Sequence, residues 1–80
     1  MERLLKQAQE RGEEVWLLMG KEELHATIKY VSDSVVIFTY QRYSKEKDRY
    51  TNWERTVKID KIEGIERQVG AVPATVKAAL

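Results

Sequence analysis

The sequence predicts a mostly β domain in which an N-terminal α-helix precedes a strongly bent, five-stranded antiparallel sheet. Two observations lead to this prediction. Apolar residues near the N-terminus recur at helical spacing, and from Val15 onward the spacing changes to the alternation of a strand. Turn-forming residues then divide the chain into short segments of strand type. We expect residues 1–70 to form one domain and residues 71–80 to form a tail that is either a short helix or disordered.

The first segment has one apolar stripe. Its residues stand at positions i, i+3, i+4 and i+7 and are Met1, Leu4, Leu5 and Ala8. Such spacing places them on one face of a helix, and Gly12 is suited to end that helix in the left-handed conformation. Because three helical turns are unstable alone in water, we expect the stripe to lie on an apolar surface.

Three strand segments follow, at residues 15–19, 24–31 and 35–40. The first is apolar on both faces, with Trp16 and Leu18 on the second face, so we expect two covers for it. The second alternates, and its predicted apolar face consists of Leu24, Ala26, Ile28 and Tyr30. Residues 20–23 and 32–34 have the composition of turns.

The rest of the chain predicts two more strands. Residues 41–52 are polar and charged, and they form either a loop or a hairpin extension with a frayed tip. We expect the fourth strand at residues 53–59, with Trp53, Arg55, Val57 and Ile59 on one face. Residues 60–61 are expected to form a tight turn or a single 3₁₀ turn, and residues 62–69 the last strand.

Composition excludes several classes of function. The chain has 80 residues, no cysteine and one histidine, His25, so disulfides and thiolate metal sites are excluded, and we expect no metal. No nucleophile–base or acid–base set is visible, so we expect neither an enzyme, nor a cofactor, nor a small-molecule substrate. No apolar run approaches the length that spans a bilayer, and the N-terminus lacks the apolar core of a signal peptide. We therefore expect a soluble, cytoplasmic protein without a membrane partner.

Self-association is the remaining support for so small a core. The fourth and fifth strands carry apolar residues without the clustered lysines or prolines that usually protect a sheet edge. These interface candidates are Val57, Ile59, Ile62, Ile65 and Val69. Pairing the fourth strand of one chain with the fifth of the next is a head-to-tail contact, which closes into a ring when the rotation permits.

The order of a short helix and five strands resembles the Sm and Sm-like family, which includes the bacterial RNA chaperone Hfq. The segment VWLLMGKEELHATIKYVSDSVVI carries most of the resemblance. The positions of the first Sm motif are taken by Gly20, Leu24, Ala26, Ile28, Asp33 and residues 35–37. The second motif corresponds to VKIDKIEGIERQV, with Ile59 and Asp60 at its turn. The resemblance implies a small open barrel, a ring of five to seven subunits, and binding of single-stranded RNA.

Candidate RNA contacts follow partly from this resemblance. Trp16 stands where Hfq has a base-stacking tyrosine, although packing under a helix or a neighbouring chain is the alternative role. The other candidates are Asp33, whose alternative role is to form a turn, Ser34, Lys58, Asp60 and Lys61. Further contacts are expected from Arg42, Tyr43, Arg49 and Tyr50, because mixed basic and aromatic residues suit single-stranded nucleic acid. A solvated hairpin tip is the alternative for this last group.

Two features favour a second function. Hfq has a Lys-His pair at the last turn, whereas this chain has Ile59-Asp60, and a carboxylate there repels phosphate. The 14 basic residues are also balanced by 13 acidic ones, without the excess of proteins that bind nucleic acid by charge alone. The alternative to RNA binding is therefore an oligomeric protein-interaction or scaffold module that keeps the ring and has lost the uridine pocket.

Overall fold

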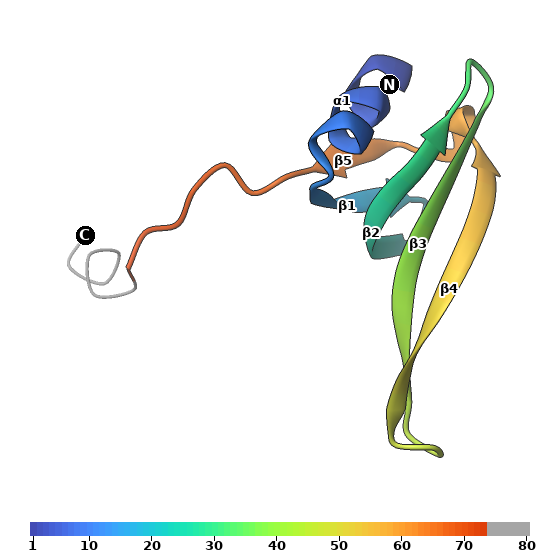
Figure 1. The fold of residues 1–80 in the computed structure, drawn as a ribbon, viewed down its shortest axis with the longest axis vertical. Helices are drawn as coiled ribbons and strands as arrows, with labels where there is room; N and C mark the ends of the chain where they lie inside the picture. Colours follow the sequence, from blue (N-terminus) through green and yellow to red (C-terminus); the bar gives the residue numbers. More distant parts are fainter. Residues whose placement is uncertain (74–80) are drawn as a thin grey trace.

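The computed structural model describes residues 1–73. Within them, α1 (Glu2–Arg11) is followed by β1 (Glu14–Met19), β2 (Glu22–Val31), β3 (Val35–Ser44), β4 (Arg49–Lys58), the 3₁₀ turn η1 (Ile59–Lys61) and β5 (Gly64–Glu66) (Figure 1). The predicted fold class is confirmed, because one helix precedes five antiparallel strands in one sheet. Residues 71–73 have no regular structure, and the rest of the predicted tail lies outside the described residues.

Helix α1 forms as its apolar spacing predicts. Leu5 and Ala8 are fully buried and belong to the core of the sheet, against which the helix packs mainly at β2. Gly12 ends the helix with φ 64°, and its N–H donates to the carbonyl of Gln9 at 3.1 Å, which confirms the predicted left-handed cap. Met1 and Leu4 were expected in the same stripe, but both are exposed at its margin.

The strands lie in the order β4-β3-β2-β1-β5, and every neighbouring pair is antiparallel. Figure 1 shows β1 and β5 crossing the direction of β3 and β4, so the sheet is strongly twisted and bent. One face of this sheet packs on the core. Its buried strand residues are Val15, Leu17, Met19, Ala26, Ile28, Val31, Val36, Phe38 and Tyr40. They alternate along each strand with outward residues, as a sheet covered on one face requires.

A β-bulge in β2 changes the predicted apolar face of that strand. Ile28 pairs with Phe38, but the next pair is Tyr30 with Ile37, so Lys29 is an extra residue. The extra residue reverses the alternation, and Val31 rather than Tyr30 enters the core, while Tyr30 is 52% exposed. The prediction for Tyr30 was therefore wrong. The carbonyl of Lys29 accepts a hydrogen bond from Gln9 Nε2 at 2.9 Å, which joins α1 to the bulge.

The third and fourth strands are longer than predicted. They remain paired from Val35 opposite Lys58 to Ser44 opposite Arg49, so residues 41–52 form a hairpin extension and not a loop. We call these residues the arm. Pairing between β2 and β3 begins at Ala26 and Tyr40, so the arm extends past the part of β3 that is paired with β2, and it projects from the domain in Figure 1.

The end of the domain also differs from its prediction. Ile59 leaves the strand and begins η1, which confirms the 3₁₀ turn, and Ile62 is buried in the core of the chain. The last strand has three residues rather than eight, because its pairing with β1 runs only from Gly64 opposite Leu18 to Glu66 opposite Trp16. Val69 lies beyond β5 and is 88% exposed.

The turn between β1 and β2 is also shorter than predicted. It occupies residues 20–21, because β2 begins at Glu22. Gly20 there has φ 59°, a left-handed conformation that suits glycine. The side chain of Glu63 ties this turn to the segment before β5, since its Oε1 accepts a hydrogen bond from the Gly20 N–H at 3.0 Å.

Candidate functional site

A groove of about 680 Å³ lies on the sheet face that carries the outward residues of β1 to β4. We call it the outer groove. Its lining includes Trp16, His25, Thr27, Thr39, Gln41 and Asn52. On β1 to β3 these residues alternate with the buried ones, so the same alternation that builds the core also places polar and aromatic groups in the groove. The rest of the lining consists of Glu14, Glu23, Leu24, Lys29 and Tyr40.

Trp16 and His25 form a stacked pair in this groove. They are direct cross-strand partners on β1 and β2, with ring centroids 4.8 Å apart and an interplanar angle of 23°. His25 Nε2 also lies 3.5 Å from the Glu14 carboxylate. Trp16 is 45% exposed. The indole is therefore held by its histidine neighbour and still offers a large aromatic surface to solvent.

Hydrogen-bonding groups continue the groove along the sheet. Gln41 Nε2 donates to Asn52 Oδ1 at 3.1 Å across the β3–β4 pair, which orients both amides. Thr27 and Thr39 are direct cross-strand partners between β2 and β3. Amides and hydroxyls can both donate and accept, so the groove combines a stacking surface with the groups that recognise the edges of unpaired bases.

The other predicted contacts near the last turn lie in a separate group. The carbonyl of Ser34 accepts a hydrogen bond from the Ile59 N–H at 2.9 Å, so the β2–β3 turn adjoins η1. Asp33 and Ser34 are exposed in that turn, and Lys58 precedes η1, which contains Asp60 and Lys61. Ser32 Oγ accepts hydrogen bonds from the N–H groups of the two residues after Asp33. Trp16 is not part of this group, because it lies in the middle of β1 between its partners on β2 and β5.

The four candidates of the arm divide between its two faces. Tyr43 and Tyr50 are cross-strand partners with ring centroids 5.2 Å apart. The Tyr43 hydroxyl donates to Asp48 Oδ1 at 2.6 Å, and this hydrogen bond raises the pKa of Tyr43. Arg42 points to the opposite face, where it contacts the rings of Tyr40 and Trp53. Arg49 pairs with Ser44 at the end of the ladder.

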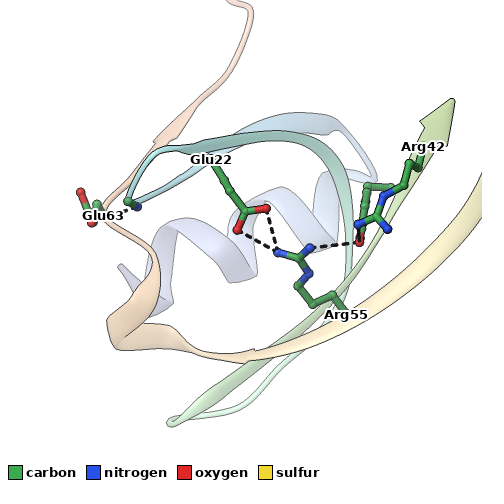
Figure 2. A network of polar contacts seen from close by, with 6 residues as sticks. Glu22, Arg42, Arg55 and Glu63 are labelled. Carbon is green, nitrogen blue, oxygen red and sulfur yellow. Dashed lines mark hydrogen bonds and ion pairs between the residues drawn. The ribbon is translucent and has the colours of Figure 1, made fainter. Parts of the chain in front are cut away.

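Sequence reasoning missed the polar network on that opposite face, which Figure 2 shows in close-up. Arg55 donates through Nη1 to both carboxylate oxygens of Glu22 at 3.3 and 3.4 Å and through Nη2 to the Tyr40 hydroxyl at 3.1 Å. Arg42 Nη2 donates to the same hydroxyl, also at 3.1 Å. The signal in the sequence is an aromatic residue two positions before an arginine, in YQR and in WER.

In the described part of the chain, histidine and carboxylate side chains form no group of three or more that could hold a metal ion. Among residues 1–73, no helix has the length and apolarity needed to cross a membrane. No known protein family, curated protein or solved structure matches this chain.

Proposed function

We propose that this protein forms a homo-oligomeric, Sm-like ring that binds single-stranded RNA in the cytoplasm. The observation that carries the proposal is the placement of β4 and β5 at opposite ends of one bent sheet. In residues 1–73 neither of these strands has a second neighbour, so each presents a row of backbone hydrogen-bonding groups on one side. Such edges pair readily with another chain.

Ring closure follows from the difference between the two edges. An interface between β4 of one copy and β5 of the next joins two different surfaces, and a series of identical head-to-tail contacts closes when the rotation permits. Val57, Ile59 and Ile65 pack against the rim of the core and remain half-buried, which suits residues that a neighbouring copy covers. Ile62 is already buried within its own chain, and Val69 lies past the paired strand.

The outer groove supports RNA as the ligand. Base–aromatic stacking contributes roughly 1–3 kcal/mol per base, and Trp16 offers such a surface beside the oriented amides of Gln41 and Asn52. The carboxylate of Asp60 in η1 disfavours phosphate near the last turn. We therefore assign the base to the outer groove, and we assign only an accessory role to Lys58 and Lys61.

Size measurement tests the ring. Light scattering at micromolar concentration is expected to give a mass of several chains, and Val57→Lys is expected to reduce it, because a charge on the half-buried edge opposes pairing. Thr51→Lys is the control, since it adds the same charge on β4 within the arm. A wild-type monomer would contradict the ring.

Titration with oligo(A) and oligo(U) tests the ligand. Affinity is expected to fall steeply with salt, because phosphate neutralisation releases counterions, and Trp16→Ala is expected to weaken binding of oligo(A) selectively. Tyr30→Ala is the control, since Tyr30 is an exposed aromatic residue that is not among those lining the outer groove. A ring that binds neither oligomer at low salt would favour the second candidate, a scaffold module, for which Asp60 and the balanced charge are the supporting observations.

A further inference from the structure

The base of the arm carries an ordered cluster of two aromatic and two cationic side chains on the face opposite Gln41 and Asn52. Tyr40 and Trp53 are direct cross-strand partners, and each is followed two residues later by an arginine. The guanidinium carbon of Arg42 lies 5.1 Å from the Trp53 ring centroid and 5.7 Å from that of Tyr40, and that of Arg55 lies 5.1 Å from Tyr40. We call Tyr40, Arg42, Trp53 and Arg55 the arginine–aromatic cluster.

The charges in this cluster are not balanced. Both guanidinium groups donate to the single hydroxyl of Tyr40, yet the carboxylate of Glu22 pairs only with Arg55 (Figure 2). Arg42 forms no ion pair with any residue in the range 1–73. Two like charges that converge on one neutral oxygen attract an anion. We expect that anion beside Arg42, because Arg42 has no counterion among the described residues.

The unused hydrogen-bond donors of Arg42 also favour an anion at this position. A guanidinium has five N–H donors in a planar fork that matches phosphate. Within the described residues, Arg42 uses only Nη2, toward Tyr40. The fork is also fixed in place, because it lies against two rings, and one of these rings is itself held by the hydrogen bond from Trp53 Nε1 to Thr51 Oγ1 at 2.8 Å. A preorganised donor loses little conformational freedom on binding.

Trp53 adds an aromatic surface next to these donors. It is 47% exposed, although it stands within a regular strand. The arm also has four basic residues against two acidic ones, unlike the balanced chain as a whole. An acidic peptide would use the charge but not the indole, whereas a nucleotide uses both.

We propose that the arginine–aromatic cluster binds one nucleotide of a single-stranded nucleic acid, with the phosphate on Arg42 and the base on Trp53. The proposal relies on the proposed function for the class of polymer. It does not rely on the outer groove, because Arg42 and Trp53, which would hold the nucleotide, are not among the residues that line that groove. Arg55 orients the Tyr40 hydroxyl and adds positive charge, while its pairing with Glu22 keeps it from competing for the phosphate.

Tryptophan fluorescence separates the two surfaces, since the chain contains only Trp16 and Trp53. Trp16→Phe leaves Trp53 as the sole reporter, and Trp53→Phe leaves Trp16. In the Trp16→Phe protein, short oligo(A) is expected to quench the remaining fluorescence through stacking on Trp53. Adding Arg42→Gln to that protein is expected to weaken the affinity for oligo(A), measured by quenching, roughly tenfold. This is the effect of losing one hydrogen bond to a charged group.

Arg3→Gln in the Trp16→Phe protein is the matched control, because Arg3 is exposed on α1 and its loss changes the net charge equally. Its dissociation constant for oligo(A) is expected to stay within about twofold of that of the Trp16→Phe protein, because salt screens a charge that lies far from the binding site. Circular dichroism of each variant checks that the sheet is intact.

Each of the following outcomes would contradict the inference. Quenching of Trp16 without quenching of Trp53 would overturn the cluster as a nucleotide site and leave the proposed RNA function standing. Quenching of neither residue, with no binding of oligo(A) or oligo(U), would overturn both. Quenching of Trp53 by a polyglutamate peptide but not by oligo(A) would also overturn this inference and assign the cluster to acidic protein segments. Equal weakening by Arg42→Gln and Arg3→Gln would contradict the specific contact with phosphate.

Discussion

The Glu22 carboxylate and the Arg55 guanidinium join the beginning of β2 to the middle of β4 across the intervening strand β3. Such a bridge between strands that are not neighbours requires the sheet to bend toward itself. Burial acts to lower the pKa of Arg55, but the hydrogen bond with Tyr40 and the charge of Glu22 outweigh it and raise that pKa. The ion pair and the curvature of the sheet therefore support each other.

Glu22→Gln is expected to have opposite effects on folding and on binding. It removes a partly exposed ion pair, so the free energy of unfolding should fall by no more than about 1 kcal/mol. It also leaves Arg42 and Arg55 without a protein carboxylate, so the affinity of the Trp16→Phe protein for oligo(A) should rise. Urea unfolding and the fluorescence titration measure the two effects.

Glu10→Gln is the control for that prediction, since it removes the same charge from an exposed residue of α1 that does not line the outer groove. If both substitutions raise the affinity equally, the gain comes from net charge alone and Glu22 has no specific effect on the cluster. If Glu22→Gln lowers the affinity, the ion pair is needed to hold Arg55 in position.

Much of the fold could be predicted from the sequence because local patterns and tertiary packing agree there. Leu5 and Ala8 on the helix, and Val36 and Phe38 on β3, are buried where their spacing places them. The bulge at Lys29 could not be predicted from the sequence of β2 alone. It depends on the pairing of β2 with β3 and on the hydrogen bond that Gln9 of α1 donates to the Lys29 carbonyl.

The candidate site could be predicted only in part. Trp16 stands out as an aromatic residue in outward phase, but its stacking on His25 depends on the register of β1 with β2, which short apolar strands do not specify alone. The arginine–aromatic cluster was missed because the charged residues 41–52 fit a loop as well as a hairpin extension. Their regular pairing brings Tyr40 opposite Trp53, and this pairing is a property of both strands together.

Gly20→Ala is expected to destabilise the protein through backbone conformation alone. Gly20 has φ 59°, and a Cβ there would meet no atom within 4 Å, so steric overlap contributes nothing. The left-handed conformation costs an ordinary residue roughly 1–2 kcal/mol. Gly20→Asn should lose less, because asparagine tolerates this conformation better. Equal losses for both substitutions in urea unfolding would show that the loss comes from something other than backbone strain.

Phe38→Ala is expected to remove a large share of the stability of the folded chain. Phe38 is fully buried, and truncation of such a residue costs roughly 3–5 kcal/mol. A domain of this size is stable by about 4–12 kcal/mol in total, at roughly 0.05–0.15 kcal/mol per residue. Phe38→Leu should lose about a third as much, because most of the cavity stays filled. Thermal unfolding followed by circular dichroism measures both, and a loss below about 1 kcal/mol for alanine would contradict the assigned core.

The ion pair between Glu13 and Arg67 predicts a dependence of stability on pH. Arg67 donates to both carboxylate oxygens of Glu13, at 3.0 and 3.1 Å, and so ties the residue after β5 to the link between α1 and β1. These hydrogen bonds are the main reason that the pKa of Glu13 lies below its ordinary value, although burial opposes them. A carboxyl with a lowered pKa in the folded state stabilises the protein above its unfolded pKa, and this contribution disappears as the pH falls through the folded pKa.

Arg67→Gln tests this dependence because it removes the main partner without changing the carboxyl, while Arg11 Nη1 stays 3.6 Å from Glu13 in the wild type. At neutral pH the wild type should unfold at a higher urea concentration than the variant. The difference should shrink as the pH falls below about 4.3, the ordinary value for glutamate, because protonated Glu13 no longer gains from Arg67. Lys61→Gln, with the same charge loss outside this pair, should show no such convergence. A difference that stays constant down to the acid unfolding transition would mean that Arg67 stabilises β5 by packing and not through Glu13.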